Sequence, residues 1–150
     1  FPTRRSSDLL PESQLDRFLM RLSLGYPSRH AEKILLQQNT RQSLISTLTH
    51  IFSEQDVLEI QQLCQSVAVG DLVLDYILDL ANETRKGRHG LSTRGVLALK
   101  KAAQSYAFIE KRSFVTVDDV QAVFVAVSAH RIGLGETETL HLMQRVDVQG

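Results

Sequence analysis

Gly90-Leu-Ser-Thr-Arg94 and the segment that follows it to about Lys111 decide the fold of this chain. Ser92 is a favoured helix N-cap, because its hydroxyl can accept a hydrogen bond from a free backbone N–H of the first turn. Apolar residues then recur every three or four positions and predict a helix with one apolar face: Val96, Leu99, Ala103, Tyr106 and Ala107. Arg94 falls in the first turn, where free N–H groups and the helix dipole favour an anion. The sequence therefore predicts a phosphate-binding arginine at the start of a long helix.

Four other segments show the same periodicity and predict further helices. They run from Ser28 to about Gln38, from Ser53 onward, from Asp71 to near Lys86, and from Thr116 to about His130. Their apolar stripes predict the core residues: Ala31, Ile34 and Leu35; Val57, Ile60, Leu63 and Cys64; Leu72, Val73, Tyr76, Ile77 and Leu80; Val120, Val123, Phe124 and Val127. Residues 39–49 are undecided, and residues 136–150 show no strong period, so they are either a docked tail or loose. The sum is a bundle of four or more helices.

The region before the bundle predicts a short helix followed by a strand. Leu10-Pro-Glu-Ser-Gln-Leu-Asp-Arg-Phe18 suits a helix, since proline fits a first turn and glutamate fits the positive end of the dipole. From Phe18 to Leu24 large apolar residues alternate with other side chains, which is typical of a strand. An isolated strand is not stable, so its sheet partners must lie elsewhere. We expect a mainly α protein whose bundle follows the remnant of a sheet-containing domain, with a hinge at Gly25-Tyr-Pro27.

The first nine residues, Phe1-Pro-Thr-Arg-Arg-Ser-Ser-Asp-Leu9, read as the translation of a sequencing adapter. We therefore expect residues 1–9 to be non-native and the parent protein to extend further at its N-terminus. The alternative is a basic, flexible native segment. Because no apolar segment follows a basic start here, the sequence predicts no signal peptide.

Composition narrows the class of protein. The 150 residues include 17 basic and 17 acidic side chains and 43% hydrophobic residues, as expected of an ordinary globular protein. A nucleic-acid binder normally carries a basic excess, so no nucleic-acid partner is predicted. The apolar runs are far shorter than the ~20 residues that span a bilayer, so no transmembrane segment is predicted. A single cysteine, Cys64, excludes an internal disulfide and fits a reducing compartment. The five histidines show no metal-ligand spacing on one helix, so no metal site is predicted.

Three stretches, taken in order, resemble the C-terminal part of MoxR-type AAA+ ATPases. Leu10–Phe18 with Leu22-Ser-Leu-Gly-Tyr-Pro27 resembles the end of the ATPase core. Gly90-Leu-Ser-Thr-Arg94 resembles the sensor 2 motif, although the family usually has Ala at position 91 and Pro at position 93. Thr116-Val-Asp-Asp-Val-Gln-Ala-Val123 with Ala129-His-Arg-Ile132 resembles the last helix of the lid. The resemblance covers about residues 10–132, and the ordered occurrence of the pieces is more specific than any one of them.

The resemblance implies a fold and an activity. The fold would be a helical AAA+ lid bundle preceded by a short helix and strand left from the α/β P-loop core. The domains would be the core end and hinge at 10–27, the lid at 28–132 and a tail at 133–150. The parent would be a cytoplasmic ATP hydrolase that uses ATP and Mg²⁺, forms a ring (generally a hexamer) and acts as a chaperone-like machine, often with a protein carrying a von Willebrand factor A domain.

Two arginines would carry the chemistry of the resemblance. Arg17 would be the arginine finger, reaching in trans into the nucleotide site of the neighbouring subunit and stabilising charge on the transferring phosphoryl group. Arg94 would be sensor 2, contacting the phosphates of its own subunit's nucleotide in cis. Asp16 would be a structural cap or an ion-pair partner rather than a catalytic acid.

The phosphate-binding loop of such ATPases, Gly-x-x-x-x-Gly-Lys-[Ser/Thr], and a Walker B acid do not occur in these 150 residues. The chain alone is therefore expected neither to hydrolyse ATP nor to bind it tightly. The main alternative is a helical protein-interaction module without nucleotide function. A weaker one is a relative of magnesium chelatases or helicase loaders, because related AAA+ branches share the lid design.

Overall fold

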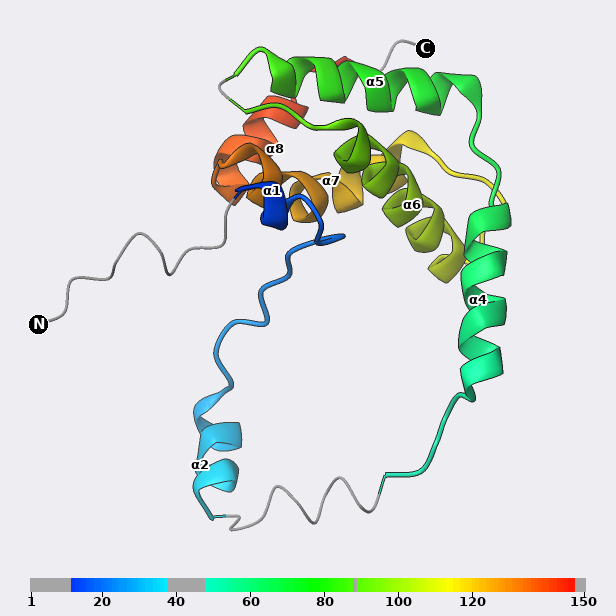
Figure 1. The fold of residues 1–150 in the computed structure, drawn as a ribbon. Coiled ribbons are helices and arrows are strands. Elements are labelled where there is room, and N and C mark those ends of the chain that lie inside the picture. The colour runs from blue at the N-terminus through cyan, green and yellow to red at the C-terminus, as the bar shows by residue number, and fades with distance from the viewer. Residues whose placement is uncertain (1–11, 38–47, 88, 148–150) are drawn as a thin grey trace, which may run out of the picture. The chain divides into compact units, whose positions relative to one another are not determined.

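A computed structural model describes residues 12–37, 48–87 and 89–147. Its helices in these ranges are α1 (Glu12–Leu15), α2 (Arg29–Gln37), α4 (Glu54–Ser66), α5 (Asp71–Arg85), α6 (Thr93–Ile109), α7 (Val117–Ile132) and α8 (Glu136–Met143) (Figure 1). The only extended pairing in the described ranges is an isolated bridge between Ala68 and Phe114. The prediction of a mainly helical protein is confirmed. None of these helices is long and apolar enough to span a membrane.

The chain divides into two compact units. One comprises residues 22–60, and the other comprises residues 1–21 together with 61–150. The predicted domain boundaries at residues 27 and 132 stay predictions. Predictions for residues 1–9 and for most of 39–49 lie outside the described part of the chain.

The smaller unit contains α2 and the start of α4. Local capping follows the sequence: Ser28 accepts a hydrogen bond from the Ala31 amide at 3.2 Å, and Ser53 and Asp56 form a reciprocal capping box at 2.7 and 3.1 Å. Neither helix has a buried residue, and α2 packs against no other described helix. The prediction that Ile34 and Leu35 face a core is therefore wrong in this structure. Periodicity identifies the apolar face of a helix, but it cannot supply the element that covers that face.

The larger unit is built around α7. This helix packs against α1, α5, α6 and α8, and α5 lies across the other helices of the group (Figure 1). Its sequence is apolar on most of its circumference, which suits a helix surrounded by others. The predicted stripe is confirmed, because Val120, Val123, Phe124 and Val127 are all buried. The tail resolves as a docked helix: α8 packs on α7 and α5 and buries Thr139 and Met143.

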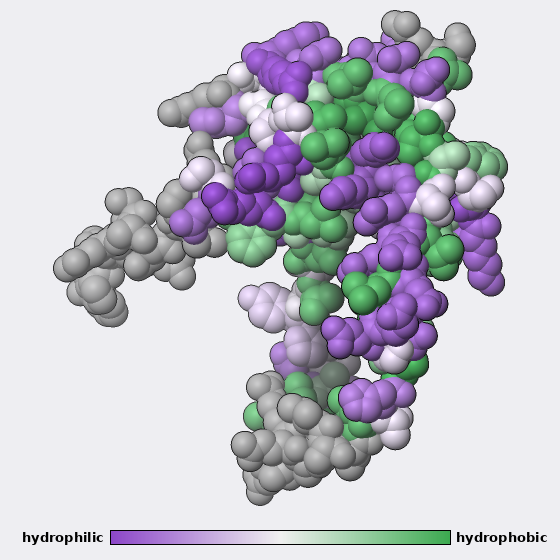
Figure 2. All heavy atoms as spheres, turned by 45° about the vertical axis from the view of Figure 1, so that its right-hand side comes forward, coloured by the Kyte–Doolittle hydropathy of each residue, from purple (hydrophilic) through white to green (hydrophobic). Residues whose placement is uncertain are grey.

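Two other core predictions need correction. Leu72 of α5 is 69% exposed, and Tyr106 of α6 is also exposed rather than in the core. The inner faces differ from the predicted stripes: α5 buries Val73, Tyr76, Ile77, Leu80, Ala81 and Thr84, and α6 buries Gly95, Ala98, Leu99, Ala102, Ala103, Gln104 and Ala107. Hydrophobic and hydrophilic residues are interspersed on the face drawn in Figure 2. An exposed apolar side chain is ordinary in a folded protein, so the stripe alone overestimates the core.

The predicted strand at 18–24 is not formed. These residues have no strand conformation, and their backbone groups bond to α7 instead. The Arg21 amide donates to the Ala126 carbonyl at 2.8 Å, and the Phe18 and Leu19 carbonyls accept from Arg131. Alternating apolar residues make a strand only when a neighbouring strand offers a ladder of hydrogen bonds, and no such neighbour is present in the described residues.

The loop between α5 and α6 is held by specific bonds that set the start of α6. Leu91 is buried, its amide donates to the Thr84 hydroxyl at 3.0 Å, and its carbonyl accepts from Arg85 Nε at 3.1 Å. At Gly90 a β-carbon would lie 2.7 Å from the Arg85 Cα, so only glycine fits this close approach to α5. The predicted N-cap is confirmed: the Ser92 hydroxyl accepts from the Gly95 amide at 3.1 Å. The first turn of α6 is thereby fixed to the core.

A buried carboxylate starts α7. Asp119 is 1% exposed and completes a capping box with Thr116, whose amide donates to it at 2.8 Å. Arg112 donates to both carboxylate oxygens. Burial alone would raise the pKa of Asp119, but the hydrogen bonds from Arg112 and Thr116 outweigh it and lower that pKa below its ordinary value.

Asp119→Asn should destabilise the chain by about 1–3 kcal/mol at pH 7, because charge-assisted hydrogen bonds and a cap are weakened. A lowered folded-state pKa contributes stability that is present above about pH 4 and lost as the pH falls through that lowered value. The difference in unfolding free energy between wild type and variant should therefore shrink on acidification. Urea titrations at pH 7 and at a series of pH values below 4 measure it. A difference that does not change with pH would contradict the assignment.

Candidate functional site

The start of α6 and the segment after α1 meet at one pocket. Its cavity volume is about 230 Å³, and it is lined by Asp16, Arg17, Leu19, Arg94, Leu97, Ala98, Lys101 and Arg131. All of these residues belong to the larger unit. Four side chains are basic and one is acidic, so the pocket has a net positive charge. Its chemistry suits an anion with several oxygen atoms, such as a phosphate chain.

The helix α6 contributes four residues to the lining. Leu97, Ala98 and Lys101 lie three, four and seven positions after Arg94, so the four residues share one helix face. Arg94 is exposed and lies in the first turn, directly after the Ser92 cap. Free backbone N–H groups at this end add to the attraction for an anion.

Arg17 enters the same pocket from the other side. It follows α1 in a turn in which its amide donates to the Gln14 carbonyl at 3.0 Å. Its side chain is exposed and also lines a neighbouring pocket with Ser13, Gln14 and Phe18. The family resemblance places Arg17 at the nucleotide of a neighbouring subunit and Arg94 at the nucleotide of its own subunit. In the structure both side chains line one cavity.

Asp16 connects the two arginine-bearing segments. Its carboxylate accepts hydrogen bonds from the Ser92 hydroxyl at 2.9 and 3.0 Å and pairs with Arg131 Nε at 3.3 Å. Its interpretation as an ion-pair partner rather than a catalytic acid agrees with these contacts. Burial lowers the pKa of Arg131, Asp16 opposes that shift, and Arg94 adds to it, so Arg94 lies within electrostatic reach of Arg131.

Sequence reasoning missed Lys101 and Arg131 as site residues. Lys101 shares the helix face of Arg94, a signal that the seven-residue spacing could have provided. Arg131 follows His130 in the last turn of α7, where a basic residue is ordinarily explained by the helix dipole, so its position in the sequence carries no sign of a role in the site. In the described residues no group of three or more His, Cys, Asp or Glu side chains could hold a metal ion.

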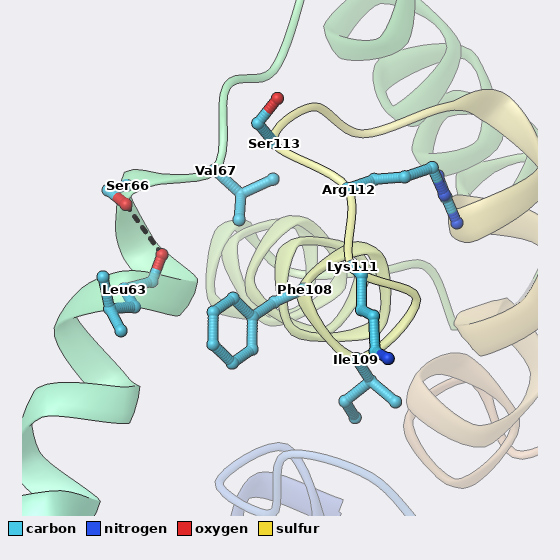
Figure 3. Close-up of a pocket in the computed structure, with 8 residues that line it drawn as sticks. All are labelled: Leu63, Ser66, Val67, Phe108, Ile109, Lys111, Arg112 and Ser113. Atoms are coloured by element: carbon cyan, nitrogen blue, oxygen red, sulfur yellow. Dashed lines mark hydrogen bonds between the residues drawn. The ribbon is translucent and has the colours of Figure 1, made fainter.

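A second, apolar pocket lies between α4 and the end of α6 (Figure 3). Its cavity volume is about 610 Å³, and its walls include Leu63, Val67, Phe108 and Ile109, with Lys111 at its edge. The Ser66 hydroxyl is bonded to the Leu63 carbonyl at 2.8 Å. This pocket has few polar groups that could orient a substrate, so it suits an apolar side chain rather than a phosphate.

Comparisons with known proteins match part of this chain to a described domain family and most of it to three other proteins. Residues 81–147 match the family model described as the AAA lid domain. The chain is 38% identical over 128 residues to YeaC of Bacillus subtilis, 30% identical over 138 residues to the chaperone MoxR1 of Mycobacterium tuberculosis, and 29% identical over 151 residues to MoxR of Paracoccus denitrificans. In each case 83% of this chain is covered, and it spans 40%, 36% and 43% of those proteins, respectively.

The fold also matches a solved structure. A crystal structure of a predicted ATPase from Cytophaga hutchinsonii superposes with a TM-score of 0.77, covering 93% of this chain and 48% of that one. The sequence identity is 24%, so this match bears on the fold alone. It confirms the helical fold of the chain.

Proposed function

Because this chain carries an AAA lid domain and belongs to the MoxR-like AAA+ proteins, we propose that it is part of an ATP hydrolase that acts as a chaperone-like machine. The observation that carries the proposal is the basic pocket in which Arg17 and Arg94 lie together. In this proposal Arg17 is the arginine finger and Arg94 is sensor 2. Both face the phosphate chain of one ATP molecule.

The electrostatics of the pocket support this role. Phosphoryl transfer spreads negative charge over the phosphoryl oxygens, and catalysis depends on positioned cations that stabilise that charge. A guanidinium presents its N–H donors in a rigid fork that matches phosphate oxygens. Arg17 and Arg94 are both exposed in the pocket and so are accessible to such a ligand. Lys101 adds a further cation.

We further propose a subunit arrangement on the basis of the shared pocket. The family resemblance assigns Arg17 to the nucleotide of a neighbouring subunit. Since one cavity of about 230 Å³ holds both side chains, we place Arg94 on that same neighbouring nucleotide rather than on its own subunit's. The proposal therefore needs a ring oligomer, generally a hexamer, in which each interface brings one nucleotide to one pair of arginines.

The rest of the nucleotide site lies outside these residues. The phosphate-binding loop, the catalytic acid and the main Mg²⁺ ligands are not among the 150 residues, so we expect no ATP hydrolysis and no tight ATP binding from this chain alone. A cytoplasmic location and a partner with a von Willebrand factor A domain follow from the resemblance and stay proposals. The same holds for the chaperone-like activity.

Arg94→Ala in the full-length protein should raise the KM for ATP by about 10- to 100-fold, because a hydrogen bond to a charged group contributes about 1.5–3 kcal/mol. If the contact is equal in ground and transition states, kcat changes little. Steady-state ATPase assays measure both constants. Arg145→Ala is the matched control, since Arg145 is exposed and does not line the pocket. Unchanged KM and kcat in Arg94→Ala would remove Arg94 from the nucleotide site.

A second candidate function is a protein-interaction module without nucleotide chemistry. The apolar pocket of Figure 3 favours it, because Ile109 is 70% exposed at its edge and could contact an apolar side chain of a partner. In this alternative neither arginine contacts a nucleotide. The Arg17 and Arg94 variants of the full-length protein would then keep the kcat and KM for ATP of the wild type. The kinetic measurements therefore separate the two functions.

A further inference from the structure

We propose that Arg131 is a positioning residue that clamps the Asp16–Leu19 segment onto the start of α6 and so fixes Arg17 beside Arg94. The inference rests on the proposed function, because it explains how the two phosphate-facing arginines keep their geometry. It assigns to Arg131 no contact with the nucleotide.

The contacts of Arg131 account for all five of its N–H groups. Nε donates to the Asp16 carboxylate at 3.3 Å. Nη1 donates to the carbonyls of Leu19, at 3.0 Å, and Val127, and also lies 3.1 Å from His130 Nε2, and Nη2 donates to the carbonyls of Asp16, at 3.3 Å, and Phe18. A guanidinium has five N–H donors. With all of them directed at protein oxygens, Arg131 has no donor left for a phosphate, although it lines the same pocket as Arg17.

The position of these acceptors explains what the clamp does. Three of the five are backbone carbonyls of residues 16, 18 and 19, which flank Arg17 on both sides. The side chain of Arg131 is only 2% exposed, so water does not compete for these bonds. Backbone atoms on either side of Arg17 are therefore tied to α7, while the Arg17 side chain remains exposed.

Two further contacts tie the clamp to α6. The Asp16 carboxylate also accepts from Ser92, the N-cap residue of the helix that carries Arg94. The Arg131 side chain passes over Gly95, where a β-carbon would come within 3.2 Å of Arg131 Cδ and 2.9 Å of Leu91 Cδ2. Arg131 thus contacts the segment before α2 and the first turn of α6 at once. The relative position of Arg17 and Arg94 therefore depends on Arg131 together with the Asp16–Ser92 hydrogen bonds.

A double-mutant cycle in the full-length protein tests the clamp. Arg131→Lys keeps the charge, but a single ammonium cannot reach five acceptors, so kcat for ATP should fall by about 10²-fold, the cost of a displacement near 1 Å. In an Arg17→Ala background the same substitution should change kcat less than about twofold, because the group it positions is gone. Arg145→Lys is the matched control and should match wild type.

Hydrogen exchange of the full-length protein gives a readout independent of activity. The Arg21 amide is bonded to the Ala126 carbonyl at 2.8 Å, close to the clamp. In Arg131→Lys the peptides covering residues 16–21 should exchange at least about tenfold faster, while the buried centre of α7 keeps its protection. Unchanged exchange in residues 16–21 would overturn the clamp.

The outcomes separate the two proposals. Equal losses of kcat from Arg131→Lys in the wild-type and Arg17→Ala backgrounds would overturn the clamp while leaving Arg17 as a finger. If Arg17→Ala leaves kcat unchanged, the proposed function fails, and hydrogen exchange alone then decides the clamp. Should Arg131→Lys fail to fold by circular dichroism, Asp16→Asn replaces it, since it keeps an acceptor oxygen but removes the ion pair. Wild-type kcat and exchange in that variant would overturn the clamp.

Discussion

Arg17→Ala in the full-length protein is expected to lower kcat for ATP hydrolysis by about 10³- to 10⁵-fold, the range found for arginine fingers. The physical reason is that the finger stabilises charge that develops only as the phosphoryl group transfers, so it contributes to the transition state and little to the ground state. Arg17 is exposed in the basic pocket, as this role requires. Steady-state ATPase assays give kcat, and titration with a fluorescent nucleotide should give a Kd close to wild type.

Arg145→Ala serves as the control for the loss of one positive charge, and it should keep wild-type turnover. An Arg17→Ala protein with near-normal kcat would show that Arg17 is not the finger. A Kd raised to the same extent as kcat falls would instead indicate an ordinary binding contact.

Mixed rings separate the shared pocket from the split arrangement expected from the sequence. If Arg17 acted in trans and Arg94 in cis, an Arg17→Ala subunit next to an Arg94→Ala subunit would assemble one complete site. Random mixing at equal amounts would then restore roughly a quarter of the sites in a ring. If both arginines of one subunit face the same nucleotide, every interface lacks one of them, and mixing restores nothing. We expect no recovery of ATPase activity at low ATP concentration.

Phe124→Ala is expected to destabilise the chain by about 3–5 kcal/mol, through lost apolar burial and the cavity that remains. Phe124 is fully buried on α7, the helix that contacts α1, α5, α6 and α8, so no single element can close the gap. Domains of this size have a total stability of about 5–15 kcal/mol, so the loss is a large fraction of it. The melting temperature of this chain should fall by roughly 6–20 °C in a circular dichroism scan.

Phe114→Ala is the matched aromatic control, because Phe114 is 55% exposed. Its effect should stay within about 0.5 kcal/mol, the usual range for a surface position. Similar melting temperatures for the two variants would mean that Phe124 is not at the centre of the core.

The local features of the fold could be predicted because they depend on residues close in sequence. Ser92 caps α6, and Ser53 with Asp56 forms a capping box, as do Thr116 and Asp119. Features that depend on a distant partner could not be predicted in this way. Residues 18–24 carry a strand pattern, but their carbonyls bond to Arg131 on α7.

In the candidate site, too, local features could be predicted and contacts between distant segments could not. Arg94 could be identified from its place after an N-cap, and Arg17 from the motif that contains it. That they line one pocket could not, because their proximity depends on packing between α7 and the segment after α1. The contacts of Arg131 could not be predicted in this way. Its acceptors include backbone carbonyls, which every residue carries, so no residue type marks them in the sequence.

At Gly95, helix propensity and the packing of neighbouring side chains favour different residues. Alanine at this position would favour the isolated helix by about 1 kcal/mol. Its methyl group, however, would occupy the space in which Leu91 and the aliphatic part of Arg131 now lie. The gain in helix propensity would therefore be set against displacement of Leu91 and of the guanidinium that holds the segment after α1, so glycine at this position serves the packing of α6 at the expense of the helix itself.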